Sequence, residues 1–122
     1  MSFSNVWRDY NTQRHRRYRD IPKLIALSRG YLKEEQPAIY SLIEATERAE
    51  KLKELGLALL GEQFEAEKIL SKHIRTTLVL CHHHHALLAK NAYMDLEHEL
   101  RDADAHLHAL HSLLIGSKSL RV

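Results

Sequence analysis

The chain has 122 residues, of which 44% are hydrophobic and 28% charged, and its formal net charge is +2. This length is enough for one domain and too short for two, and so small a net charge gives no reason by itself to expect nucleic-acid binding. No apolar run approaches the ~20 residues that a membrane-spanning helix needs, and the first residues show no secretion signal. A single cysteine excludes an internal disulfide. We therefore expect a cytoplasmic protein without membrane contact.

Residues 1–30 form a basic N-terminal segment with seven Lys or Arg and two Asp. Ser4 can begin a first helix, and Asp20 can begin a short second one that ends before Gly30. Arginines beside aromatic side chains can bind phosphates and stack on bases. Contact with nucleic acid or an acidic protein partner is therefore predicted for five side chains: Arg14, Arg16, Arg17, Tyr18 and Arg19. In the alternative interpretation, the aromatic side chains pack on the rest of the protein and the arginines face water.

Residues 31–60 contain an amphipathic helix that we expect from about residue 37 to residue 60. Its apolar residues recur at helical spacing. They are Ala38, Leu42, Ala45, Ala49, Leu52 and Leu59. Gly61 then turns the chain into an antiparallel helical hairpin.

Residues 62–115 contain no proline or glycine and carry apolar side chains every three or four positions, which is typical of one helix face. A single helix from 63 to 114 would be about 78 Å long and would need a partner chain to cover it. A break at residues 90–93 is the alternative that we favour slightly, because helices of that length are rare. The stripe has more apolar surface than the preceding helix can cover, so it also predicts self-association. The expected oligomer contacts are Leu78, Leu88, Leu96, Leu100, Leu107 and Leu110. Residues 116–122 are expected to be a loose tail.

The same segment contains the only cysteine and nine of the ten histidines. If Cys81 to His85 is helical, these two side chains lie one turn apart and can both bind a Zn²⁺ or other transition-metal ion. Further ligands on a facing helix would share one face at i, i+4 and i+8, and they are His98, Asp102 and His106. The alternative is that the histidines form a polar seam, a surface or an oligomer contact.

The six residues from Arg101 to His106 resemble the Arg-polar-x-x-x-His motif of HEPN-type ribonucleases, which are small, all-helical and usually dimeric. The resemblance implies that Arg101 would bind phosphate and that His106 would act as acid–base group across a dimer. The alternative is a charged helix face on which Arg101 pairs with Glu97 or Asp104.

Residues 1–122 are thus predicted to be a single all-α domain, an antiparallel helical bundle with a His-rich C-terminal segment. The function that we favour is a non-enzymatic regulator, adaptor or inhibitor. It would act as a homo-oligomer through its helical faces, with the basic segment on nucleic acid or an acidic partner. A metal-binding bundle and a HEPN-like ribonuclease are the alternatives.

Overall fold

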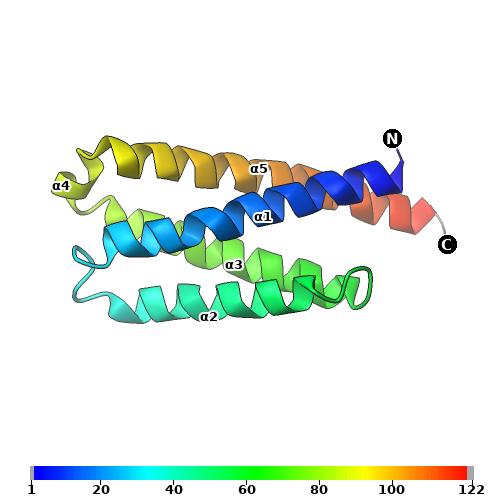
Figure 1. Ribbon diagram of the computed structural model, residues 1–122, viewed down its shortest axis with the longest axis horizontal. Coiled ribbons are helices and arrows are strands. Elements are labelled where there is room, and N and C mark those ends of the chain that lie inside the picture. Colours follow the sequence, from blue (N-terminus) through cyan, green and yellow to red (C-terminus); the bar gives the residue numbers. More distant parts are fainter. Residues whose placement is uncertain (1, 121–122) are drawn as a thin grey trace.

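The computed structural model describes residues 2–120, and it describes side chains for residues 2–116. In this range the regular structure is entirely helical: α1 (Phe3–Ser28), α2 (Gln36–Lys53), α3 (Leu60–Cys81), α4 (His85–Leu88) and α5 (Asn91–Leu120). The four long helices alternate in direction, with α1 packed mainly on α5 and α2 on α3 (Figure 1). The predicted all-α antiparallel bundle is confirmed.

Helix α1 is one continuous helix, where the sequence predicts two short N-terminal helices. It is capped by Ser2, whose hydroxyl accepts a hydrogen bond from the Asn5 N–H at 3.2 Å, and not by Ser4. Pro22 lies inside the helix, so the prediction of a boundary there is wrong. A proline in a helix costs roughly 3 kcal/mol. The buried side chains of Ile21 and Leu24 offset this cost, since burying each stabilises the fold by about 1.5–3 kcal/mol.

The long C-terminal segment is broken, as we favoured, but the break begins at His82 and not at residue 90. His82–His84 leave the helix, the short α4 follows, and α5 starts at Asn91. The break changes the helical phase between α3 and α5. The fully buried side chains of residues 85–95 are therefore Leu87 and Tyr93. Cys81 and His85 therefore do not share one helix, and the helical spacing on which their pairing depended is absent.

The apolar stripe of α3 and α5 lies inside the bundle. Most of the leucines predicted as oligomer contacts are at most 7% exposed: Leu78, Leu96, Leu100 and Leu107. Leu88 and Leu110 are half-buried. The stripe is covered because α1 is a long helix that packs on α5, which the predicted short helices could not do. The apolar surplus from which we predicted self-association is thus filled within one chain, and self-association itself stays a prediction.

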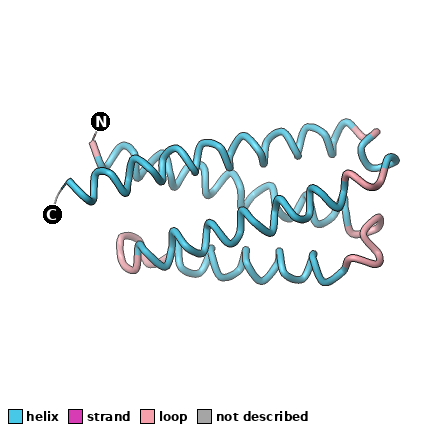
Figure 2. The backbone as a smooth tube through the Cα atoms, turned by 180° about the vertical axis from the view of Figure 1, so that it is seen from behind, coloured by secondary structure: helices cyan, strands magenta, loops and turns pink. Residues whose placement is uncertain are grey.

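Two apolar clusters stabilise the bundle. The larger cluster occupies most of its length, with Leu24, Leu42 and Leu70 among its fully buried members. The smaller cluster joins α1, α3 and α5 around Phe64 and Leu114. It lies at the end of the bundle that holds the start of α1, the last part of α5 and, on the other side, the α2–α3 loop (Figures 1 and 2).

Helix α5 continues to Leu120, so residues 116–120 are helical where we expected a loose tail. Residues 121–122, the rest of that predicted tail, lie outside the described residues. In the described part of the chain, no helix is both long enough and apolar enough to cross a membrane.

Candidate functional sites

The α2–α3 loop, residues 54–59, exposes leucine side chains at one end of the bundle. The predictions that the preceding amphipathic helix reaches residue 60, that Gly61 makes the turn and that Leu59 joins the core are wrong, because α2 ends at Lys53 and Gly61 lies in α3. Leu55, Leu57 and Leu59 are 45%, 59% and 53% exposed. Leu113 and Ile115 of α5 are also exposed and flank Leu114 of the small apolar cluster at this end. We call the three loop leucines, Leu55, Leu57 and Leu59, the apolar end. Exposed apolar side chains that gather in one place often mark a contact surface.

The backbone of this loop is unusual at its two left-handed residues. Gly56 has φ +63°, which glycine adopts freely, but Leu59 has φ 55° and ψ 44°. The left-handed conformation costs a residue with a side chain about 1–2 kcal/mol. Leu59 is half-exposed, so it recovers little of this cost by burial in its own chain.

Gln63 holds the loop in place from inside the bundle. Its amide nitrogen donates to the carbonyls of Gly56 at 2.8 Å and Ala58 at 2.7 Å, and its amide oxygen accepts from Arg14 Nη1 at 2.8 Å. This amide orientation is the only one its neighbours allow, because arginine only donates and carbonyls only accept. Gln63 is 1% exposed. The loop conformation is therefore linked to a buried charged cluster.

Two fully buried arginines of α1 form that cluster with Glu67 of α3. Arg17 Nη2 lies 2.6 Å from Glu67 Oε1, and Arg14 Nη1 lies 3.9 Å from Glu67 Oε2. Tyr18 donates a hydrogen bond to the same carboxylate. Arg17 also donates to Ser71 Oγ at 2.5 Å. One buried carboxylate thus serves two buried guanidinium groups.

Aromatic rings complete the surroundings of these arginines. The Arg14 guanidinium lies 5.2 Å from the centre of the Trp7 ring and 5.0 Å from that of Tyr10, which are cation–π contacts. Burial and the negative charge of Glu67 raise the pKa of both Tyr10 and Tyr18 well above the usual range, so both hydroxyls stay protonated. The Nε atoms of Arg14 and Arg17 have no hydrogen-bond partner.

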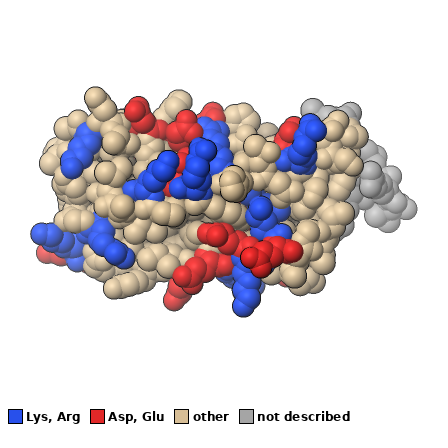
Figure 3. Space-filling view, in the orientation of Figure 1, with Lys and Arg blue, Asp and Glu red and all other residues tan. Residues whose placement is uncertain are grey.

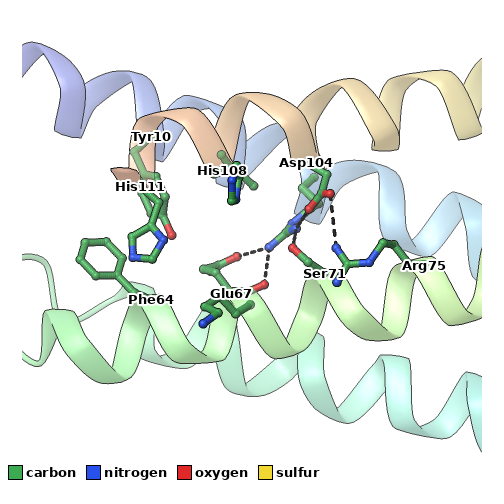
Figure 4. A pocket seen from close by; sticks show the side chains of 11 residues that line it. Tyr10, Phe64, Glu67, Ser71, Arg75, Asp104, His108 and His111 are labelled. Atoms are coloured by element: carbon green, nitrogen blue, oxygen red, sulfur yellow. Dashed lines mark hydrogen bonds and ion pairs between the residues drawn. The ribbon is translucent and has the colours of Figure 1, made fainter. Parts of the chain in front are cut away.

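A groove of about 340 Å³ opens between α3 and α5 beside the cluster (Figure 4). Tyr10, Phe64 and His111 lie together in one part of it. Ser71 and Arg75 of α3 lie in the other part, facing α5. The remaining lining residues include Arg17, Glu67, Lys68, Asp104 and His108. The groove is therefore apolar in one part and charged in the other.

A second polar cluster joins the α3–α4 turn to α5. Glu97 Oε1 accepts from the Tyr93 hydroxyl at 2.8 Å and lies 2.6 Å from His82 Nε2. Burial alone would raise the pKa of Glu97, but these hydrogen bonds and the positive charge of Arg101 hold it below its usual value. Burial raises the pKa of the neighbouring Cys81 thiol to about 11, so this cysteine is a poor nucleophile near neutral pH.

The Glu97 contacts predict a loss of stability in acid. Because its folded-state pKa lies below the ordinary value of 4.5, Glu97 stabilises the fold above that pH. This contribution disappears as the pH falls through the folded-state pKa. In urea unfolding, we expect the difference in stability between wild type and Glu97→Gln to shrink below about pH 4. A difference that stays constant or grows in acid would contradict the assignment.

The residues of the basic segment mostly bind the protein's own carboxylates. Arg14 and Arg17 are buried, so the expectation that these arginines face water is wrong. Arg16 binds Glu99 at 2.7 Å and Asp102 at 2.8 Å. Arg19 is exposed, and Tyr18 binds Glu67 as described above. Basic and acidic side chains are interspersed over the face seen in Figure 3. Nucleic-acid or acidic-partner binding by these residues stays a prediction.

The residues predicted as metal ligands lie in several places. Cys81 is fully buried at the end of α3, and His85 is exposed in α4. His98, Asp102 and His106 follow one another along α5, where Asp102 binds Arg16. Among the described residues, no group of three or more His, Cys, Asp or Glu side chains is arranged to hold a metal ion. Metal binding by these residues stays a prediction.

Arg101 and His106, the residues of the ribonuclease resemblance, have separate partners on α5. Arg101 Nε lies 3.5 Å from Glu97 Oε2, which is the ion pair of the alternative interpretation. His106 Nδ1 lies 2.9 Å from the Asp102 carbonyl oxygen. Five residues along a helix correspond to a rotation of about 140°, so the two side chains start from different faces. Their catalytic role stays a prediction.

Sequence reasoning missed Gln63, Glu67 and the groove. Glu67 looks like an ordinary polar residue of an amphipathic helix, and nothing nearby in the sequence indicates that it faces two arginines. The one available signal was the spacing of Tyr10, Arg14 and Arg17, which share a face of α1 with the buried Val6 and Ile21. A continuous α1 would have placed these arginines in the interface.

The bundle and its charged interior define an all-α protein of two antiparallel helix pairs, α1 with α5 and α2 with α3, that share a buried polar cluster. The chain belongs to the LemA family, whose sequence model matches residues 6–115, from α1 into the last part of α5. No curated protein and no solved structure matches the chain. The family match supports the helical fold and identifies no ligand or activity.

Proposed function

We propose that this LemA-family chain is a non-enzymatic adaptor that acts as a homodimer, with two copies in contact at the apolar end. The observation that carries this proposal is the α2–α3 loop, which exposes three leucines on a backbone that Gln63 holds in place. A rigid surface loses little entropy when it binds a partner, so its apolar area contributes more fully to affinity. Covering the Leu59 side chain in a dimer would offset the energetic cost of its left-handed backbone conformation.

A second copy of this chain suits the charges around the loop. Lys53 and Glu54 lie next to each other before the leucines, and Glu62 follows them. A two-fold contact brings the same surface of both copies together, so a surface with both signs of charge can complement itself. Residues 55–61 carry no charge that would have to be buried. The contact is small, and we expect a weak dimer, with a dissociation constant on the order of 10–100 μM.

The test is the molar mass of the untagged protein by sedimentation equilibrium from about 10 μM to 1 mM, a range that brackets the affinity expected of a small interface. The variant Leu55→Ser Leu57→Ser removes apolar surface from the loop, and we expect it to be monomeric throughout. Val79→Ser is the matched control, because Val79 is 57% exposed on α3 but lies outside the apolar end. It should dimerise like the wild type.

Two results would overturn the proposal. One is a wild-type protein that is monomeric at 1 mM, a concentration well above the expected dissociation constant. The other is a dimer that survives in the Leu55→Ser Leu57→Ser variant, which would place the contact elsewhere. In the first case, the apolar end would have to bind a protein other than a second copy of this chain.

A further inference from the structure

The charges around the groove between α3 and α5 are not balanced. Glu67 is already shared between Arg17 and Arg14, and Asp104 lies 3.5 Å from Arg17 and 3.4 Å from Arg75. Lys68 forms no ion pair with any described residue. The groove and the arginine behind it thus hold four cations against two carboxylates: Arg14, Arg17, Lys68 and Arg75 against Glu67 and Asp104.

Apart from Asp104, which is already counted, the α5 wall of the groove adds no negative charge. It carries His108 and His111, and burial together with the positive charge of Lys68 lowers the pKa of His111. Buried charges are normally paired, because an unpaired charge in a poorly solvated place is costly. Arg17 is fully buried, lines the groove and keeps one N–H without a partner.

We propose that this groove binds a small organic anion, a phosphate or carboxylate group attached to an aromatic or other apolar body. The anionic group is bound by Lys68 and Arg75, with the Ser71 hydroxyl beside them. The apolar body packs on Phe64 and Tyr10, which lie away from Arg75 along the groove in Figure 4. A volume of about 340 Å³ lies within the range of small-molecule sites.

Both parts of the groove are needed for this ligand class. An inorganic anion can pair with the cations but leaves the aromatic part empty. A neutral aromatic molecule fills that part but leaves the surplus charge unpaired. Hydrogen bonds to charged groups stabilise a complex by about 1.5–3 kcal/mol each, so the charged contacts should dominate the affinity.

The test uses the full-length protein and four probes: phenyl phosphate, benzoate, benzyl alcohol and inorganic phosphate. Binding is measured at pH 7.5 by calorimetry and by amide chemical shifts in two-dimensional NMR. We expect phenyl phosphate or benzoate to bind and to shift the amides of Ser71, Arg75 and Asp104. Whichever binds more tightly identifies the acidic group that the groove prefers. Benzyl alcohol and inorganic phosphate should each bind at least about tenfold more weakly.

The decisive variant is Lys68→Gln Arg75→Gln, which removes two exposed cations and leaves the buried cluster intact. We expect it to bind the preferred probe at least about tenfold more weakly. Lys72→Gln, an exposed change on the same helix outside the groove, should bind like the wild type. Equal affinity in the double variant and the wild type would overturn the proposal. Benzyl alcohol binding as tightly as the organic anions would also overturn it. So would the absence of detectable binding by either organic anion at a ligand concentration of ~10 mM.

Discussion

Replacing Glu67 with alanine is expected to lower the free energy of unfolding by about 3–5 kcal/mol, which is a large part of the stability of a domain of this size. The side chain of Glu67 is 5% exposed and lies 2.6 Å from a nitrogen of the fully buried Arg17. Without it, two buried guanidinium groups lose their shared counter-ion, and the Tyr18 hydroxyl loses its acceptor. Chemical denaturation followed by circular dichroism measures the loss.

Two further variants separate charge from packing in this cluster. Glu65→Ala changes an exposed glutamate of the same helix and should alter stability by less than about 0.5 kcal/mol. Glu67→Gln keeps the shape and part of the hydrogen bonding without the charge, and its loss should lie between those of the two alanine variants. A loss below about 1 kcal/mol for Glu67→Ala would show that the pairing is energetically minor.

Replacing Gln63 with alanine is expected to cost about 2–3 kcal/mol and also to loosen the loop above it. The fully buried Arg14 loses an acceptor at 2.8 Å, while the carbonyls of Gly56 and Ala58 can turn to water. We therefore expect faster amide hydrogen exchange in residues 54–60 and a weaker association of the proposed homodimer. Denaturation, exchange and sedimentation measure the three effects.

The variant Gln63→Glu tests whether the buried cluster and the loop depend on the same side chain. A carboxylate still accepts from Arg14, but it cannot donate to the loop carbonyls and repels them. We expect this variant to retain more stability than Gln63→Ala and yet to show equally fast exchange in the loop. Slow exchange in both variants would mean that the loop keeps its conformation without Gln63.

The helical character of this chain could be read from its sequence because it depends on local regularities. Leu42 and Ala45 in α2, and Leu96 and Leu100 in α5, follow helical spacing, and all four are buried. The break before α5 was harder to place, because four consecutive histidines contain no strong helix-breaking residue. At Pro22 the error is the reverse: the proline predicts a helix boundary where the helix is continuous. The burial of Ile21 and Leu24 outweighs this local signal.

The candidate sites depended on contacts between residues far apart in the chain. Arg14 meets Gln63 and Arg17 meets Glu67, pairs separated by about fifty residues. An arginine in a basic run has the same local sequence whether it faces water or a buried carboxylate. Phe64, Arg75 and Asp104 likewise line one groove only because α3 and α5 face each other across it in the folded bundle.

The sequence by itself determined that this protein is an all-α antiparallel bundle, because helical periodicity acts over a few positions. It placed the turn of the helical hairpin at Gly61, whereas the turn is residues 54–59 and Gly61 lies in α3. Only the tertiary structure decided that Arg14 and Arg17 of the basic N-terminal segment belong to an internal charged cluster and that the leucine stripe of α5 is covered by α1. It also decided that the α2–α3 loop exposes three leucines. The physical reason is that burial and ion pairing depend on which helix faces which, and no local pattern in the chain specifies that arrangement.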